Sequence, residues 1–74
     1  MSRLPTLDST RFIRALKRAG FVESGQLGSH LHLKNPQTGR RTVVPVHGGD
    51  LKRGLMKLII KQAGLTERQF LKYL

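Results

Sequence analysis

The 74-residue sequence predicts an α+β domain in which helices cover one face of a three-stranded antiparallel sheet. Apolar residues recur at helical spacing near both ends of the chain, whereas the middle alternates between apolar and polar residues. Segments rich in Gly and Pro separate these patterns and mark turns. The expected order is α-β-β-β-α-α in one domain over residues 1–74, with a short N-terminal arm at 1–7 and a short C-terminal helix at 66–74.

The first helix is expected to begin after Asp8, because aspartate is a favoured N-cap residue. Gly20 stops the helix, since glycine commonly takes the left-handed conformation just past a helix end. The apolar positions are Phe12, Ile13, Ala15, Leu16 and Ala19. The remaining face carries Arg11, Arg14, Lys17 and Arg18. This helix should therefore bury one side and present cations on the other.

Three short strands are expected next, at 21–24, 29–34 and 40–46. The segment Asn35–Gly39 joins the last two as a turn, with a proline and a glycine at positions that favour one. Pro45 lacks the backbone N–H that a sheet ladder needs. The third strand is therefore predicted to lie at an edge of the sheet or to have a solvent-facing backbone position at Pro45.

The second strand determines which side chains the sheet presents to its surroundings. Leu31 and Leu33 alternate with His30, His32 and Lys34. Because successive side chains of a strand point to opposite faces, directing the leucines to the core directs the other three away from it. We therefore expect an open sheet face that displays two histidines and a lysine.

A second helix is expected from about 52 to 63, closed by Gly64. Its predicted core stripe consists of Leu55, Leu58, Ile59 and Gln62 or Ala63. Thr66 and Gln69 have the spacing of a capping box, which predicts that a last helix begins there. This short helix carries Phe70, Leu71 and Leu74.

The charge balance points to a polyanionic partner. The sequence has 14 Lys and Arg residues against 4 Asp and Glu residues, a formal net charge of +10. Such a surface attracts nucleic acid first and anionic membranes second. No long basic amphipathic helix is free of a core role, which weakens the membrane interpretation. Because the sequence contains no cysteine, no signal-peptide pattern and no long apolar run, we expect a cytoplasmic protein.

The same composition argues against several kinds of active site. The four acids, Asp8, Glu23, Asp50 and Glu67, are dispersed, whereas two-metal and glycosidase sites need carboxylates that converge. Ser29 and His30 are strand neighbours and project to opposite faces, so they do not form a Ser–His pair. A zinc site from His30, His32 and His47 is conceivable, yet no carboxylate is evidently placed to orient the imidazoles. We expect neither a metal nor another cofactor.

One nucleic-acid chemistry needs neither metal nor carboxylate. RNA carries its own nucleophile, the 2′-hydroxyl, so an enzyme need only move protons and neutralise charge at the phosphate. Histidine suits the proton steps because it titrates near neutral pH, and lysine and arginine suit the charge. The residues alone permit metal-independent RNA cleavage by a histidine without deciding between His30, His32 and His47, and each of these also fits a plain surface or structural role.

A set of motifs occurs in one order along the chain. It comprises Gly20-Phe21, Gln26, Gly28-Ser29-His30, Val44-Pro45-Val46-His47, Gly54-Leu55, Ile59 and Ala63-Gly64-Leu65. This set resembles the HicA family of bacterial toxins, the ribonuclease half of HicA–HicB toxin–antitoxin pairs. The resemblance implies a fold like the double-stranded RNA-binding domain, an mRNA interferase activity and a HicB antitoxin that masks the active site. It also implies that His30 is catalytic, with Gly28 and Ser29 shaping its strand entry.

The hypothesis is thus an endoribonuclease that uses a histidine general acid or base. The residues expected to bind its RNA are His32, Lys34, Arg40, Arg41, His47, Lys52, Arg53 and Lys57. The competing interpretation is a non-catalytic module that binds double-stranded RNA or DNA. The segment 55–74 superficially resembles a helix-turn-helix, although its second helix offers few cations for the major groove. A third alternative is a chain that acts mainly by binding another protein.

Overall fold

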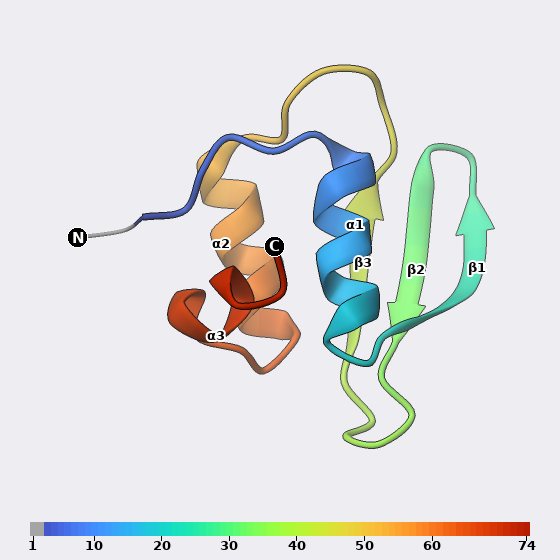
Figure 1. Ribbon diagram of the computed structural model, residues 1–74. Coiled ribbons are helices and arrows are strands. Elements are labelled where there is room, and N and C mark those ends of the chain that lie inside the picture. The colour runs from blue at the N-terminus through green and yellow to red at the C-terminus, as the bar shows by residue number, and fades with distance from the viewer. Residues whose placement is uncertain (1–2) are drawn as a thin grey trace.

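The computed structural model describes residues 3–74 and has the predicted order of elements. They are α1 (Ser9–Arg18), β1 (Val22–Leu27), β2 (His30–Lys34), β3 (Arg41–Pro45), α2 (Arg53–Gln62) and α3 (Glu67–Leu71). The strands form one antiparallel sheet in the order β1-β2-β3, and the helices lie on one side of it (Figure 1). This confirms the predicted α+β class and its likeness to the double-stranded RNA-binding domain.

Helix α1 begins and ends where the sequence predicts. The Asp8 side chain accepts a hydrogen bond of 2.8 Å from the Arg11 backbone N–H, which satisfies one of the unpaired donors of the first turn. At the other end, Gly20 follows the helix with φ of +108°, in the left-handed region that favours glycine. Phe12 and Leu16 are fully buried between these ends. The helix thus packs its apolar side into the core.

The segment before α1 is part of the core. Residues 1–2 of the expected arm lie outside the described residues, but Leu4 and Leu7 are fully buried. The Leu51 N–H donates to the Leu7 carbonyl at 2.8 Å, and the Arg53 guanidinium donates to the Leu4 carbonyl. Two buried leucines and these two hydrogen bonds hold the segment across the start of α2.

Strand β1 is longer than predicted and contains a β-bulge. It pairs with β2 from Val22 to Leu27, and the register shifts between Glu23 and Gly25, so Ser24 is the extra residue. Every residue of β1 is exposed. Strand β3 forms the opposite edge of the sheet, as the proline at position 45 predicts.

Helix α2 buries Ile59 and Ala63 of the predicted stripe but is rotated away from the predicted phase. Its buried residues are Met56, Ile59 and Ile60, followed by Ala63, whereas Leu58 is 52% exposed and Leu55 is half-buried. Two overlapping apolar stripes fit helical spacing here, and the sequence prediction chose the wrong one. Packing against the core decides between them, because the observed phase buries Met56 and Ile60 and leaves Leu58 in solvent. Gln62 lies beside the sheet, where its side chain accepts a 3.0 Å hydrogen bond from the buried Thr42 hydroxyl.

Helix α3 closes the core as the capping box predicts. The Gln69 N–H donates to the Thr66 hydroxyl at 3.1 Å, and the Thr66 N–H donates to the Gln69 side chain at 2.9 Å. The Phe70 ring packs against Phe12 with ring centroids 4.9 Å apart, which joins α3 to α1. Leu74, by contrast, is exposed. Over residues 3–74, the longest helices fall well short of the apolar length that a membrane crossing requires.

Candidate nucleic-acid interface

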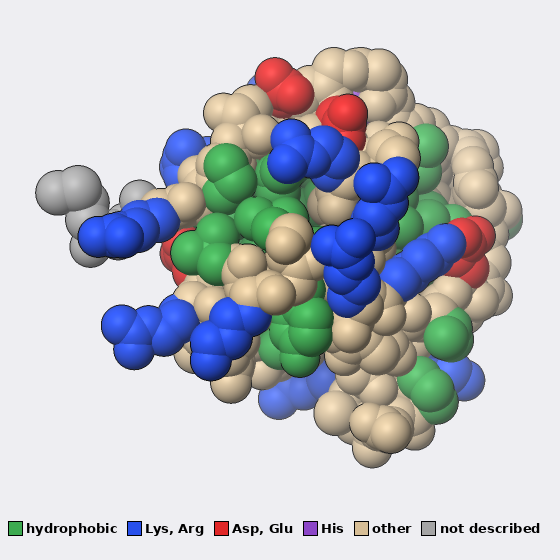
Figure 2. Space-filling view, viewed as in Figure 1, with side chains coloured by type: hydrophobic (Ala, Val, Ile, Leu, Met, Phe, Trp, Pro, Cys, Tyr) green, Lys and Arg blue, Asp and Glu red, His purple; other side chains and the backbone are tan. Residues whose placement is uncertain are grey.

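The sheet face turned away from the helices carries His30, His32 and Lys34 of the predicted site. On β2, Leu31 and Leu33 are buried toward the helices, His30 is exposed and His32 and Lys34 are half-buried. This burial pattern confirms the predicted alternation. Seen from the helix side, Lys and Arg side chains are spread over the surface while almost no histidine surface is visible (Figure 2).

The strand register arranges this open face in three rows, because directly paired residues of neighbouring strands project to the same side. In the order β1, β2, β3, the rows are Leu27, His30 and Pro45; Gly25, His32 and Val43; and Val22, Lys34 and Arg41. The ionisable groups therefore run along β2 and end beside a cation of β3. The positions flanking both histidines carry apolar side chains or none.

His30 is the first residue of β2 and follows a tight hairpin turn. Gly28 has φ of +58° and Ser29 does not have a positive φ, the pattern of a type II′ turn with glycine at its first central position. The Gln26 side-chain amide donates to the Gly28 carbonyl at 3.0 Å, and the Val46 N–H donates to the Ser29 carbonyl at 2.6 Å. Hydrogen bonds from both neighbouring chain segments thus hold the turn that positions His30.

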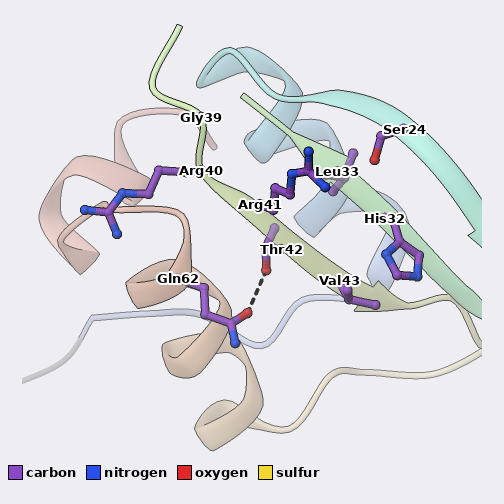
Figure 3. A pocket seen from close by; sticks show the side chains of 9 residues that line it. All are labelled: Ser24, His32, Leu33, Gly39, Arg40, Arg41, Thr42, Val43 and Gln62. Atoms are coloured by element: carbon purple, nitrogen blue, oxygen red, sulfur yellow. Dashed lines mark hydrogen bonds between the residues drawn. The ribbon is translucent and has the colours of Figure 1, made fainter. Parts of the chain in front are cut away.

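His32 stands at the rim of two shallow hollows. One opens toward β1 and is lined by Ser24, Gly25, Gln26 and Leu27 of that strand, together with Lys34 and Arg41. The other opens toward β3 and the end of α2, and includes Arg40, Thr42 and Gln62. Arg41 extends across β2 toward β1, so its guanidinium group is on the same side of the sheet as the His32 ring (Figure 3).

Comparison with known protein families identifies the family to which this chain belongs. A model of the HicA toxin family, described as the HicA toxin of bacterial toxin–antitoxin systems, matches residues 9–65. The chain belongs to this family. The match runs from α1 to just past α2 and so includes the whole sheet and the Gly-Ser-His turn. No curated protein matches the chain. Membership makes this HicA protein the toxin of a toxin–antitoxin pair, for which a HicB antitoxin is the implied partner.

The remaining residues predicted to bind RNA lie away from the open face. Arg40 directly precedes β3 and points toward the end of α2, where its side chain lies over Gly64 (Figure 3). Lys52 is the N-cap of α2, and Lys57 is exposed on that helix. Arg53 donates to the Leu4 carbonyl, so it holds the N-terminal segment in place. The predicted set therefore divides between the sheet face and the helix layer.

His47 lies in the loop that leaves the sheet beside His30. Pro45 pairs with His30, and the Val46 N–H bonds to Ser29, so His47 follows two residues after the partner of His30. The His47 carbonyl accepts from the Ser9 hydroxyl at 3.3 Å, which ties this loop to the start of α1. Its ring Nδ1 lies 2.9 Å from the Gly48 carbonyl oxygen.

The acidic residues occupy other parts of the fold. Asp8 caps α1 and its backbone bridges Asp50, Glu23 forms an ion pair with Lys17 of α1, and Glu67 lies in the first turn of α3. As far as residues 3–74 form it, the open face therefore carries positive charge and no carboxylate. Within residues 3–74, no three His, Cys, Asp or Glu side chains come together in a way that could hold a metal ion.

Sequence reasoning missed the contribution of β1 to this face. The Ser24 bulge and the bare position at Gly25 open the hollow beside His32. A glycine inside a strand pattern often marks a bulge, so Gly25 could have indicated the bulge from the sequence. The predicted first strand, however, ended at residue 24 and left this glycine outside it.

Proposed function

We propose that this HicA protein is a metal-independent endoribonuclease, an mRNA interferase that uses His30 as a general acid or base. The observation that carries the proposal is the position of His30 on an exposed, cationic sheet face where residues 3–74 place no carboxylate. Such a face favours a phosphodiester backbone, and an exposed imidazole at the end of a strand is accessible to a single-stranded or locally open RNA.

In the proposed reaction, RNA supplies the nucleophile. A base removes the 2′-hydroxyl proton, the 2′ oxygen attacks phosphorus, and the bond to the 5′ oxygen breaks as an acid protonates that oxygen. The products are a 2′,3′-cyclic phosphate and a 5′-hydroxyl. Lys34 and Arg41 are suited to stabilise the charge that develops on the phosphate oxygens, because charge-assisted hydrogen bonds are strong where water is partly excluded. The HicB antitoxin would inhibit the toxin by covering this face.

The decisive experiment compares cleavage of mRNA by the purified wild-type protein and by His30→Ala, both in the presence of EDTA. Loss of a proton-transfer group should lower kcat on the order of 10²–10⁴-fold. Lys72→Ala is the control for substitution, because Lys72 is an exposed residue at the end of α3. Thermal unfolding of all three proteins establishes that they are folded.

Several outcomes would contradict the proposal. Full activity of His30→Ala would remove this histidine from the chemistry, and wild-type activity abolished by EDTA would indicate a metal. A wild-type protein that retards RNA in a gel without cleaving it would favour the binding module. Growth arrest by wild type, but not by His30→Ala, would connect the cleavage to toxicity.

A further inference from the structure

The proposed cleavage needs two proton-transfer groups, and the open face carries a second imidazole. His32 lies two residues after His30 on β2, so both rings project from the same face. Their Cα atoms are roughly 7 Å apart along the strand. The neighbours of His32 in its row are Gly25 and Val43, and neither places a polar side chain against the ring.

The hollow beside His32 is shallow, open to solvent and cationic, with a volume of about 550 Å³. The charged groups that line this hollow are Lys34 from β2 and Arg41 from β3, and the part of β1 that lines it contributes none. Arg40 lines the second hollow beside His32. A phosphate in this hollow would therefore meet two cations and no competing carboxylate.

We propose that His32 is the second proton-transfer group, paired with His30 across the scissile phosphate. This inference rests on the proposed function. In an in-line displacement the attacking 2′ oxygen and the departing 5′ oxygen lie on opposite sides of phosphorus, so one imidazole does not serve both in the same step, and a second imidazole on the same face is suited to serve the other. One imidazole takes the 2′-hydroxyl proton as the new P–O bond forms. The other gives a proton to the 5′ oxygen as the old P–O bond breaks.

The first test separates proton transfer from charge. His32→Ala should lower kcat on the order of 10²–10⁴-fold, with RNA affinity changed only a few-fold. His32→Lys places a permanent positive charge at the hollow but does not exchange protons readily near neutral pH. If His32 only bound phosphate, His32→Lys would retain nearly wild-type kcat, and this would overturn the inference. Because His32 is half-buried, the thermal unfolding of His32→Ala and His32→Lys is measured as a check that both variants are folded.

The second test assigns the acid with a modified RNA in which sulfur replaces the bridging 5′ oxygen. A thiol has a pKa near 8.5, far below that of an alcohol, so a thiolate leaves without receiving a proton. The variant that lacks the general acid should recover to within about tenfold of wild type on this RNA, whereas the variant that lacks the base should not. We expect recovery of one of His30→Ala and His32→Ala. Recovery of both, or of neither, would contradict the pairing.

The two proposals fail in distinguishable ways. If the wild-type protein does not cleave RNA at all, the proposed function is wrong. If the wild type cleaves and His30→Ala does not, but His32→Ala cleaves at the wild-type rate, the function stands and the role of His32 is wrong. Lys72→Ala again serves as the substitution control, because it lies on α3 away from the sheet face.

Discussion

At the scale of single residues, the Gly-Ser pair before His30 has a conformational role. Gly28 has φ of +58°, in a region that costs most L-residues energy, and Ser29 completes the turn. The turn sets where β2 begins and so which face receives His30. A shift of one residue would turn every side chain of β2 to the other face, placing the leucines in solvent.

The Gly28→Ala substitution tests this role. A Cβ added at Gly28 would meet no atom within 4 Å, so its cost comes from the backbone conformation alone. We expect the free energy of unfolding to fall by about 1–2 kcal/mol, measured by urea denaturation. Gly48→Ala is the matched control, since Gly48 has equal space and no positive φ. Equal losses in both variants would contradict the argument.

At the scale of elements, helix ends and strand alternation follow from local chemistry. Asp8 and the Thr66–Gln69 box bind backbone groups within three residues, so short sequence patterns reveal them. The rotational phase of α2 does not follow from local chemistry, because the consecutive apolar residues near its centre fit two stripes equally well. Contact with the sheet selects one stripe and leaves Leu58 in solvent.

Paired alanine substitutions test the observed phase of α2. Ile60→Ala should lower the free energy of unfolding by about 2–5 kcal/mol, because it removes buried atoms and leaves a cavity. Leu58→Ala should change it by no more than about 0.5 kcal/mol, because that side chain is largely exposed. Denaturation curves of the two variants measure the difference. A larger loss for Leu58→Ala would restore the phase predicted from the sequence.

At the scale of the whole molecule, the net charge of +10 is distributed over both sides. Cations cover parts of the helix layer (Figure 2), and Lys34 and Arg41 lie on the open face, so charge alone does not locate the RNA. The open face differs from the helix layer because histidines lie beside Lys34 and Arg41 there. Residues 3–74 place no carboxylate on it. An acidic antitoxin surface would complement it by electrostatic attraction.

The salt dependence of RNA binding tests which cations contact phosphates. In a His30→Ala background, Lys34→Gln with Arg41→Gln should reduce the slope of log affinity against log salt by about 1.4, since each phosphate contact on single-stranded RNA contributes about 0.7. Arg68→Gln with Lys72→Gln removes the same charge from α3 and should leave the slope unchanged. Equal effects of the two double variants, measured by fluorescence anisotropy, would place the RNA elsewhere.

The sequence by itself determined the order of elements, the caps of α1 and α3, and the face on which His30, His32 and Lys34 lie. These features arise from interactions a few residues apart or from the two-residue period of a strand. The family also followed from sequence motifs, and the match over residues 9–65 establishes it.

Only the tertiary structure decided the phase of α2, the burial of Leu4 and Leu7, and the bulge that opens a hollow beside His32. It also separated Arg41, which crosses the sheet face, from Arg40, which turns toward α2 (Figure 3). The physical reason is that these features depend on packing and strand pairing between segments distant along the chain. Local patterns restrict such contacts without choosing among them.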